Sequence, residues 1–267
     1  MRIAEITITV PGGRRAEAER LAYAAGAQGL EVRDADTGLR DRVQIVWWAP
    51  LSVRRAILRM VRAKGVEVAA RVVEASWMPA PRARNLGTRF VVVGPDDGRA
   101  RVRGRVALPL EASLGFGDGL HPTTALCVEA MERLAIPTSV LDVGTGTGVL
   151  AIVAARLGAE RVVATDVDPL AREAARGNLV RCGVSAKLRA DLPGGRFGLV
   201  VSNLYFEPLL GLLPELTARA GTLVVSGFGL GSSPTVAARI RELGLSPARA
   251  RTRAGFACIT ATRPPSR

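Results

Sequence analysis

The sequence has little of several residue types that carry chemistry. Of its 267 residues only three are cysteine and one is histidine, and lysine occurs only at Lys64 and Lys187. The cysteines, at Cys127, Cys182 and Cys258, lie far apart and match no metal-ligand spacing and no disulfide framework. We therefore expect no metal site and a cytoplasmic protein without structural disulfides.

Long apolar runs are also missing. No run approaches the roughly 18 residues that a membrane-spanning helix needs, and residues 1–7 alternate polar and apolar side chains without a signal-peptide core. Hydrophobic residues make up 48% of the chain and the mean hydropathy is +0.20. The sequence therefore predicts a well-packed globular protein without a membrane partner, in one large domain or two unequal ones.

Acidic residues are outnumbered by basic ones. The formal net charge is +13 and the isoelectric point is about 11.2, and nearly all of the positive charge is arginine. Such a charge suits contact with nucleic acid or another acidic surface. A GC-rich genome produces the same composition, and neither a zinc finger nor an RNP motif accompanies the charge. Direct contact with nucleic acid therefore has no motif to support it.

The most informative stretch is residues 140–149, with the sequence Val-Leu-Asp-Val-Gly-Thr-Gly-Thr-Gly-Val. A short apolar strand would end in a turn formed by Gly144, Gly146 and Gly148, and a helix would begin at once. A second strand, residues 161–165, would end at Asp166. This order presents bare backbone to a nucleotide-like ligand, and the carboxylate can accept hydrogen bonds from both ribose hydroxyls.

The spacing of the glycines separates two classes of ligand. Dinucleotide folds use Gly-x-Gly-x-x-Gly, where a helix N-terminus meets a pyrophosphate, and Val149 occupies the third glycine position here. Gly-x-Gly-x-Gly preceded by an acid, here Asp142, is usual in S-adenosylmethionine enzymes, whose cofactor has no phosphate. Either glycine pattern alone is a weak signal, and an ordinary glycine-rich turn is the alternative. The presence of Asp166 favours the cofactor site.

Residues 1–75 predict a small separate domain. Strands are expected at 2–10, 29–33, 43–49 and 66–74, and helices at 14–25 and 51–64. The resulting order, βαββαβ, is the ferredoxin-like α+β arrangement. This domain contains neither histidine nor cysteine, and its fold alone implies no chemistry. We interpret it as a substrate-recognition domain, with a purely structural appendage as the alternative.

Residues 76–109 predict a linker rich in proline and arginine, followed by a β-hairpin. The two arms of the hairpin would be residues 90–94 and 101–108. Arginines alternate along the second arm, so we expect them to share one strand face: Arg99, Arg101, Arg103 and Arg105. This face could serve an acidic partner, but a solvated sheet face is the commoner explanation.

Residues 110–267 predict the larger domain. Strands and helices alternate regularly and a hairpin of residues 247–253 and 256–262 closes the pattern, as in the Rossmann-like seven-stranded sheet of class I methyltransferases. Polar residues follow two of these strands. Asp191, after the third, could lie near an adenine amino group or in a plain turn. Asn203 and Tyr205 follow the fourth, where open α/β sheets place reacting groups.

A glycine-rich loop precedes this pattern at residues 115–124, Gly-Phe-Gly-Asp-Gly-Leu-His-Pro-Thr-Thr. Thr123 or Thr124 could cap the helix that follows. Phe116 could lie over a flat ligand, and Thr124 could donate its hydroxyl to the same ligand. His121 is the only histidine of the chain, and a structural role and a role in the site are both open.

Together these motifs resemble the ribosomal protein L-11 methyltransferase (PrmA) family. The resemblance rests on Phe-Gly-Asp-Gly-Leu-His-Pro-Thr-Thr, Leu-Asp-Val-Gly-Thr-Gly-Thr-Gly-Val, Asp-Val-Asp-Pro and Ser-Asn-Leu-Tyr, and it is strongest over residues 105–230. It implies S-adenosylmethionine as cofactor, with contacts at Thr124, Gly144, Asp166 and Asn203. It also implies that the N-terminal domain grips ribosomal protein L-11, whose lysine side chains and N-terminal amine would be methylated.

For the chemistry, we expect Asn203 and the carbonyl that follows it to hold the amine, with Tyr205 and His121 as further catalytic candidates. Three alternatives stay open. The enzyme could methylate another protein lysine or a small molecule, or it could be an RNA or DNA amino-methyltransferase. The latter usually carry Asn-Pro-Pro-Tyr or Asp-Pro-Pro-Tyr, and this chain has neither. The third alternative is a non-catalytic, ribosome-associated protein that binds the cofactor.

Overall fold

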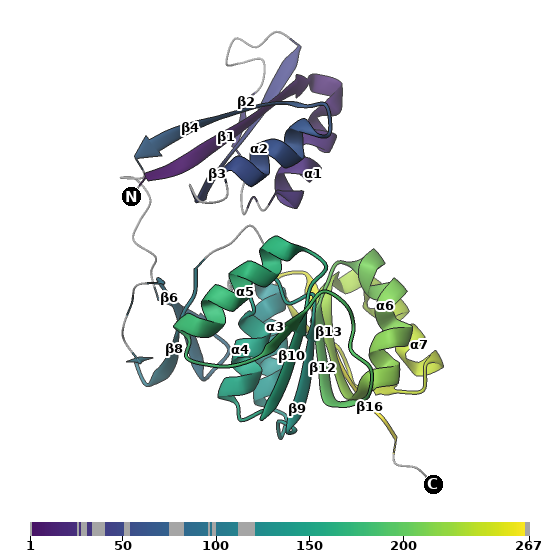
Figure 1. The fold of residues 1–267 in the computed structure, drawn as a ribbon. Coiled ribbons are helices and arrows are strands. Elements are labelled where there is room, and N and C mark those ends of the chain that lie inside the picture. The colour runs from purple at the N-terminus through teal and green to yellow at the C-terminus, as the bar shows by residue number, and fades with distance from the viewer. Residues whose placement is uncertain are drawn as a thin grey trace. The chain divides into compact units, whose positions relative to one another are not determined.

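The computed structural model describes residues 2–25, 27, 31–33, 41–50, 54–74, 83–95, 97, 100–111 and 121–264. The chain forms two compact units, Met1–Ala80 and Pro81–Arg267 (Figure 1). The segment predicted as a linker and hairpin, 76–109, is therefore not a part of its own, because its described strands belong to the second unit. Among the described residues, no helix is long and apolar enough to cross a membrane.

The first unit contains a four-stranded antiparallel sheet in the order β2-β3-β1-β4. Its elements are β1 (Arg2–Pro11), a 3-10 turn (Gly12–Arg14), α1 (Arg15–Ala24), β2 (Glu31–Arg33), β3 (Arg42–Pro50), α2 (Arg54–Arg62) and β4 (Glu67–Glu74). Alternate residues of β1 are buried, as are Ile57 and Val61 of α2. This pattern is expected of a sheet that packs one face against helices. Substrate recognition by this unit stays a prediction.

The second unit begins with a small sheet in the order β5-β6-β8-β7. Its strands are β5 (Arg84–Leu86), β6 (Phe90–Val93), β7 (Arg101–Val102) and β8 (Arg105–Pro109). The predicted hairpin of residues 90–94 and 101–108 was wrong, because β6 and β8 pair in parallel. Each has an antiparallel partner that is closer in sequence, β5 for β6 and β7 for β8. Short turns favour these local pairings over the predicted one.

The arginines of this segment do not share one strand face. Arg101 lies in β7 and Arg105 in β8, while Arg103 and Gly104 form the turn between them. The φ angles of these two turn residues are 50° and 79°. Two consecutive positive φ angles define a type I′ turn, whose twist matches the strands on either side. Arg99 lies outside the described residues.

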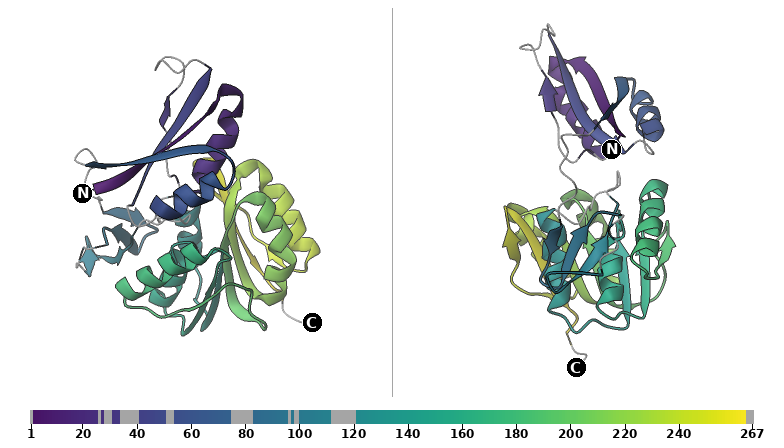
Figure 2. Two further views of the ribbon diagram at one scale, coloured as in Figure 1. Left: turned by 45° about the horizontal axis from the view of Figure 1, so that its top comes forward. Right: turned by 90° about the vertical axis from the view of Figure 1, so that its left-hand side faces the viewer.

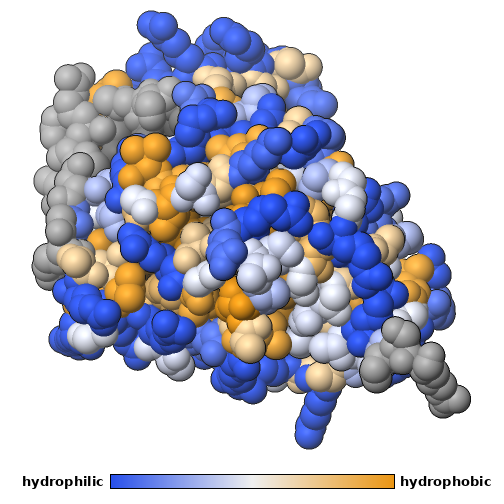
Figure 3. Space-filling model, turned by 60° about the horizontal axis from the view of Figure 1, so that its bottom comes forward, coloured by the Kyte–Doolittle hydropathy of each residue, from blue (hydrophilic) through white to orange (hydrophobic). Residues whose placement is uncertain are grey.

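Several other arginines pair with carboxylates of the same chain: Arg181 with Glu111, Arg219 with Glu215, Arg239 with Glu242 and Arg253 with Glu129. Exposed pairs of this kind contribute little to stability. On the face drawn in Figure 3, hydrophilic side chains lie among smaller groups of hydrophobic ones. Because these arginines have acidic partners within the protein, their charge alone does not indicate an acidic binding partner.

The larger sheet of the second unit has the order β11-β10-β9-β12-β13-β16-β14, with β15 paired to β16. Its strands are β9 (Ser139–Val143), β10 (Arg161–Thr165), β11 (Lys187–Arg189), β12 (Phe197–Asn203), β13 (Ala220–Gly229), β14 (Ser246–Pro247), β15 (Arg251–Arg253) and β16 (Phe256–Thr262). The strands from β11 to β13 in this order are parallel, and β16 is antiparallel to β13. The predicted seven-stranded Rossmann-like sheet is confirmed, with β15 as a short addition.

Helices cover both faces of this sheet (Figures 1 and 2). They are α3 (Pro122–Glu132), α4 (Val149–Arg156) and α5 (Pro169–Arg181) on one face, and α6 (Phe206–Arg219) and α7 (Ser233–Glu242), with the 3-10 turn Leu230–Ser232, on the other. Val140 of β9 packs in the first layer, while Leu141 and Val143 pack in the second. Strands that are apolar on both faces are typical of a buried parallel sheet. The strand order reverses at β9, because β10 and β11 follow on one side of it and β12 and β13 on the other. Open α/β sheets bind ligands at such a point.

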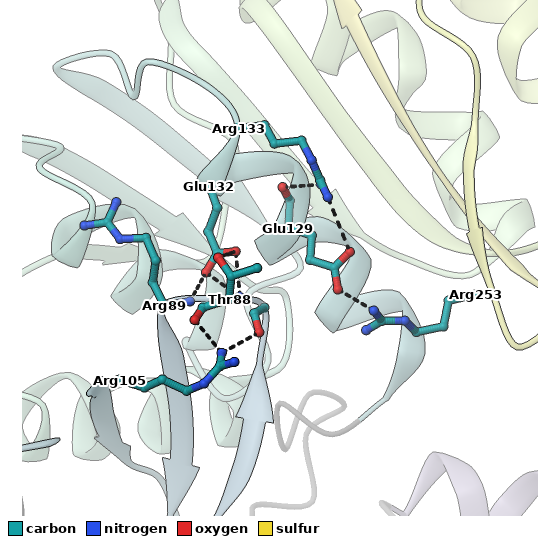
Figure 4. A network of polar contacts seen from close by, with 8 residues as sticks. Thr88, Arg89, Arg105, Glu129, Glu132, Arg133 and Arg253 are labelled. Atoms are coloured by element: carbon teal, nitrogen blue, oxygen red, sulfur yellow. Dashed lines mark hydrogen bonds and ion pairs between the residues drawn. The ribbon is translucent and has the colours of Figure 1, made fainter. Parts of the chain in front are cut away.

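Glu132, at the end of α3, holds the small sheet against the larger domain (Figure 4). Its carboxylate accepts hydrogen bonds from the backbone N–H groups of Thr88 and Arg89, at 2.8 and 2.7 Å, and from the Thr88 hydroxyl at 2.8 Å. A Cβ atom at Gly87, where φ is 63°, would lie 2.7 Å from the same carboxylate. Arg105 donates to the carbonyls of Gly87 and Thr88. The turn between β5 and β6 is thus held on two sides.

We expect Glu132→Ala to lower the free energy of unfolding by about 1–3 kcal/mol, because hydrogen bonds to a charged group are lost. Amide hydrogen exchange at Thr88 and Arg89 should accelerate. Urea unfolding and exchange measured by mass spectrometry check both effects. Glu215→Ala is the matched control, since its exposed pair with Arg219 lies within one helix and should contribute less than about 0.5 kcal/mol. Unchanged exchange at Thr88 would contradict the assignment.

Candidate active site

The predicted glycine turn lies between β9 and α4. Gly144, Gly146 and Gly148 have φ angles of 74°, 53° and 82°. These lie in the left-handed region, which glycine adopts without the steric cost that other residues incur. Gly148 is the N-cap of α4. A Cβ atom added at Gly148 would lie 3.1 Å from the Cβ of Ala175 in α5, so glycine at this position also lets α4 and α5 approach each other.

The N–H groups of this turn are largely used within the protein. Three backbone bonds of 2.8–2.9 Å close it, from Gly144 and Thr145 to the Thr165 carbonyl and from Gly148 to the Thr145 carbonyl. The Gly146 N–H donates to Oδ2 of Asp166 at 2.9 Å. A pyrophosphate needs free N–H groups and no carboxylate beside them. The turn therefore suits a nucleoside without phosphate better than a dinucleotide.

Asp166 follows β10 and is partly exposed. Besides the bond from Gly146, it accepts one from the Asp168 N–H to Oδ1 at 3.0 Å. Arg172 of α5 donates to the carbonyls of Asp166 and Val167, at 2.7 and 3.1 Å, and so fixes the backbone there. A carboxylate has about four lone-pair sites, so the Asp166 side chain can accept further hydrogen bonds, and its contact with ribose stays a prediction.

Asp142 is fully buried and holds the glycine turn through hydrogen bonds. Its Oδ2 accepts hydrogen bonds from the Thr145 hydroxyl at 2.6 Å and from the Ala151 N–H at 3.1 Å. Its Oδ1 has no hydrogen-bond partner among the described residues. Burial raises the pKa of Asp142 from 3.8 to about 7. The predicted cofactor role of Asp142 stays a prediction, and its buried side chain contacts Thr145 and Ala151 of the same chain.

Asn203 and Thr124, which are distant in sequence, lie together. Asn203 ends β12 and Thr124 lies in the first turn of α3, and the Asn203 Nδ2 donates to the Thr124 Oγ1 at 3.2 Å. The Asn203 Oδ1 is buried and has no partner among the described residues. A buried acceptor without a donor is costly. The Asn203 amide is therefore held on one side by Thr124 and keeps one acceptor without a donor among the described residues.

Leu204 joins this amide to the glycine turn. A Cβ at Gly144 would lie 2.4 Å from the Leu204 Cδ2, and a Cβ at Gly227 would lie 2.1 Å from its carbonyl oxygen. The Leu204 N–H donates to the carbonyl of Ser226 at 3.1 Å. Gly227, with φ of 99°, was not predicted as part of the site. Its signal was a run of alternating glycines, Gly227, Gly229 and Gly231, after an apolar strand pattern, where glycine indicates a bulge or a close backbone approach.

His121 has a structural role, which the sequence left open beside a role in the site. It is the N-cap of α3, and its Nδ1 lies 3.3 Å from the Thr123 N–H nitrogen and 2.7 Å from the Thr123 hydroxyl. The expectation that Thr123 or Thr124 caps this helix was wrong, because Pro122 takes the first helical position. The His121 ring packs edge-on against Phe256, with 4.7 Å between centroids.

The remaining predicted residues are less informative. Tyr205 precedes α6 and is 55% exposed, and its catalytic role, like that of His121, stays a prediction. Asp191 is exposed and pairs with Arg189 at 2.7 Å, and this hydrogen bond holds the pKa of Asp191 below its usual range. A contact with adenine also stays a prediction. Phe116 lies outside the described residues.

Asp166→Ala should weaken S-adenosylmethionine binding about 10- to 100-fold, because it removes ribose acceptors and releases the Gly146 and Asp168 N–H groups. Isothermal titration calorimetry measures the change. Glu160→Ala, at the opposite end of β10, is the control and should bind like the parent protein. An unchanged affinity in Asp166→Ala would remove the ribose assignment.

The raised pKa of Asp142 predicts a pH dependence of stability. The folded state binds this proton more tightly than the unfolded chain, so the carboxyl stabilises the fold most at low pH. That stabilisation is lost as pH rises from 3.8 through about 7. Asn at this position does not titrate. Between about pH 5 and about pH 8, the unfolding free energy of the parent should fall relative to Asp142→Asn by about 1–3 kcal/mol. Parallel pH curves in urea unfolding would contradict this.

Comparison with known proteins agrees with the geometry. The family model for ribosomal protein L11 methyltransferase (PrmA) matches residues 57–264. The L11 methyltransferase of Geobacter metallireducens is 40% identical over 163 residues, 58% of this chain and 54% of that protein. That of Symbiobacterium thermophilum is 36% identical over 197 residues, 71% of this chain and 65% of that protein. The chain thus spans 54–65% of the length of these relatives.

A solved structure is also similar. The ribosomal protein L11 methylase of Lactobacillus delbrueckii subsp. bulgaricus superposes with a TM-score of 0.63 at 28% identity, covering 68% of this chain and 98% of that one. A turn that suits a nucleoside without phosphate agrees with S-adenosylmethionine, the cofactor of this class of methyltransferase. Since the family match covers well over half of the sequence, including the turn, Asp166 and Asn203, the chain belongs to the ribosomal protein L11 methyltransferase (PrmA) family.

Proposed function

We propose that the protein is a cytoplasmic N-methyltransferase that uses S-adenosylmethionine to methylate ribosomal protein L11, at lysine side chains and the N-terminal amine. One observation carries this proposal. The turn and Asp166, which suit a phosphate-free nucleoside, follow strands of the same sheet as Asn203, whose Oδ1 has no partner among the described residues. β9 and β12 are adjacent parallel strands, and Val143 pairs with Ser202 in their register. Donor and acceptor of a methyl group would thus bind at neighbouring strand ends.

In this proposal Asn203 holds the amine. Because its Nδ2 is occupied by Thr124, the amide keeps one orientation and its Oδ1 accepts an N–H bond from the amine. The nitrogen lone pair is then free to face the methyl group. S-adenosylmethionine, when bound, supplies that methyl group on a positively charged sulfur. The chain contributes alignment within roughly 3–3.5 Å and exclusion of water.

The amine must lose its proton before it can react. Burial lowers the pKa of an ammonium group, because the charged form is disfavoured away from water. Leu204 contributes to this burial, since it packs against Gly144 and its carbonyl is held beside Gly227. Tyr205, which is exposed next to it, would contact the substrate protein. His121 acts through the capping of α3, which carries Thr124.

The substrate follows from the relatives, which are named L11 methyltransferases at 36–40% identity. The family match begins at residue 57, so most of the first unit lies outside it. In this proposal that unit recognises L11. An RNA or DNA substrate is less well supported, since Leu204 and Tyr205 stand where those enzymes carry two prolines.

Purified protein, S-adenosylmethionine and L11 provide the test, with mass spectrometry to locate methyl groups. Methylation of L11 amines is expected. If L11 gains no methyl group, the substrate assignment fails, and if calorimetry shows no cofactor binding, the whole proposal fails. At saturating cofactor, Asn203→Ala should lower turnover on the order of 100-fold, because the amine is no longer aligned. Asn85→Ala, in the exposed part of β5, is the control and should react normally.

A further inference from the structure

A fully buried amide that takes no part in the chemistry above lies next to the glycine turn. Asn178 is in α5 and has no exposed surface. Its Nδ2 donates to the carbonyl of Thr147 at 3.0 Å and to that of Glu111 at 3.3 Å. Its Oδ1 accepts from the Glu111 N–H at 2.9 Å and from Arg181 at 3.4 Å. Both N–H groups and the carbonyl oxygen are thus fully used.

We propose that Asn178 is a positioning residue for cofactor binding, which fixes the glycine turn against the segment that leaves β8. This inference rests on the proposed S-adenosylmethionine site and names a residue that sets its geometry. The amide binds both the N–H and the carbonyl of Glu111, so it holds that backbone as a neighbouring strand would. The same amide holds Thr147, which lies between Gly146 and Gly148. One side chain thus sets the distance between the two segments.

Two neighbouring contacts also join the end of α5 to the segment that leaves β8. Arg181, one helical turn after Asn178, pairs with the Glu111 carboxylate. The Cys182 Sγ lies 3.8 Å from the carbonyl of Pro109, at the end of β8. The end of α5 is therefore fitted against residues 109–111. Asn178 also reaches onward to the turn, through a hydrogen bond to the Thr147 carbonyl.

Position 178 would need no polar residue for packing alone. Ala171, Ala175 and Leu179 share the buried face of α5 with it, and an apolar side chain would avoid the cost of burying an amide. A buried polar group that is fully satisfied specifies one arrangement of its partners. The arrangement specified here is that of the turn on which the nucleoside binds.

Two variants remove this link from opposite sides. Asn178→Asp keeps an acceptor for the Glu111 N–H but loses both donors, and turns a charge toward two carbonyls. Glu111→Pro removes the N–H that donates to Asn178 at an exposed position. Glu111→Ala keeps that N–H and is its matched control. Thr217→Val controls for a lost buried hydroxyl, because the Thr217 hydroxyl bonds the carbonyls of Leu213 and Pro214 in its own helix.

The measurements are the dissociation constant of S-adenosylmethionine by calorimetry and the melting temperature without ligand. We expect weaker binding of about 10-fold in Asn178→Asp and about 3- to 10-fold in Glu111→Pro, from the loss of one or two hydrogen bonds. Glu111→Ala and Thr217→Val should stay within about twofold of the parent. Thr217→Val should still melt at a lower temperature, which shows that lost stability alone does not weaken binding.

The inference is overturned if Asn178→Asp and Glu111→Pro bind the cofactor like the parent while melting earlier, since the amide would then only stabilise the fold. If one of the two does not fold, the affinity of the other decides. If the parent itself does not bind S-adenosylmethionine, the proposed function fails, and this result is distinct from equal binding by parent and variants.

Discussion

The structure depends on how one turn satisfies its own backbone. Four consecutive or nearly consecutive N–H groups at the end of β9 would form an anion site if they were free, because a helix begins directly behind them. Here they donate to the Thr165 carbonyl, the Thr145 carbonyl and the carboxylate of Asp166. The turn is therefore rigid and close to a negative charge before any ligand arrives. A sugar with two hydroxyls and a cationic sulfur suits such a surface, and a pyrophosphate does not.

Two buried oxygen atoms without hydrogen-bond partners among the described residues, Oδ1 of Asp142 and Oδ1 of Asn203, are the cost of this arrangement. Asp142 braces the turn at full burial, which raises its pKa to about 7, and Asn203 keeps an amide oxygen without a donor. A fold selected for stability alone would replace or satisfy both groups. A positive charge near the turn would favour the ionised form of Asp142, and an amine would satisfy Asn203. The unfavourable features of the free protein are those that a sulfonium and an amine would relieve.

Much of this was predictable from the sequence, and the failures have physical causes. The glycine turn, Asp166 and the strand ending at Asn203 follow from local patterns, because period and turn chemistry act within a few residues. The pairing of β6 with β8 could not be predicted, since parallel partners are chosen by packing between segments that a longer connection separates. The capping of α3 by His121 was missed because Pro122 shifts the helix start. Gly227 and Asn178 act on residues distant in sequence, so each gave only the signal of a misplaced glycine or amide.

Two of the three glycines of the turn, finally, are required for different contacts, and this links the two halves of the site. Gly148 admits Ala175 of α5, and Gly144 admits the side chain of Leu204. Leu204 also lies against Gly227. Asn203, the residue before Leu204, carries the amide that is proposed to hold the amine. The glycine turn and the end of β12 are therefore in direct contact, so the position of one fixes the position of the other. For a displacement that requires alignment of donor and acceptor, this shared packing is the simplest way for one fold to hold both.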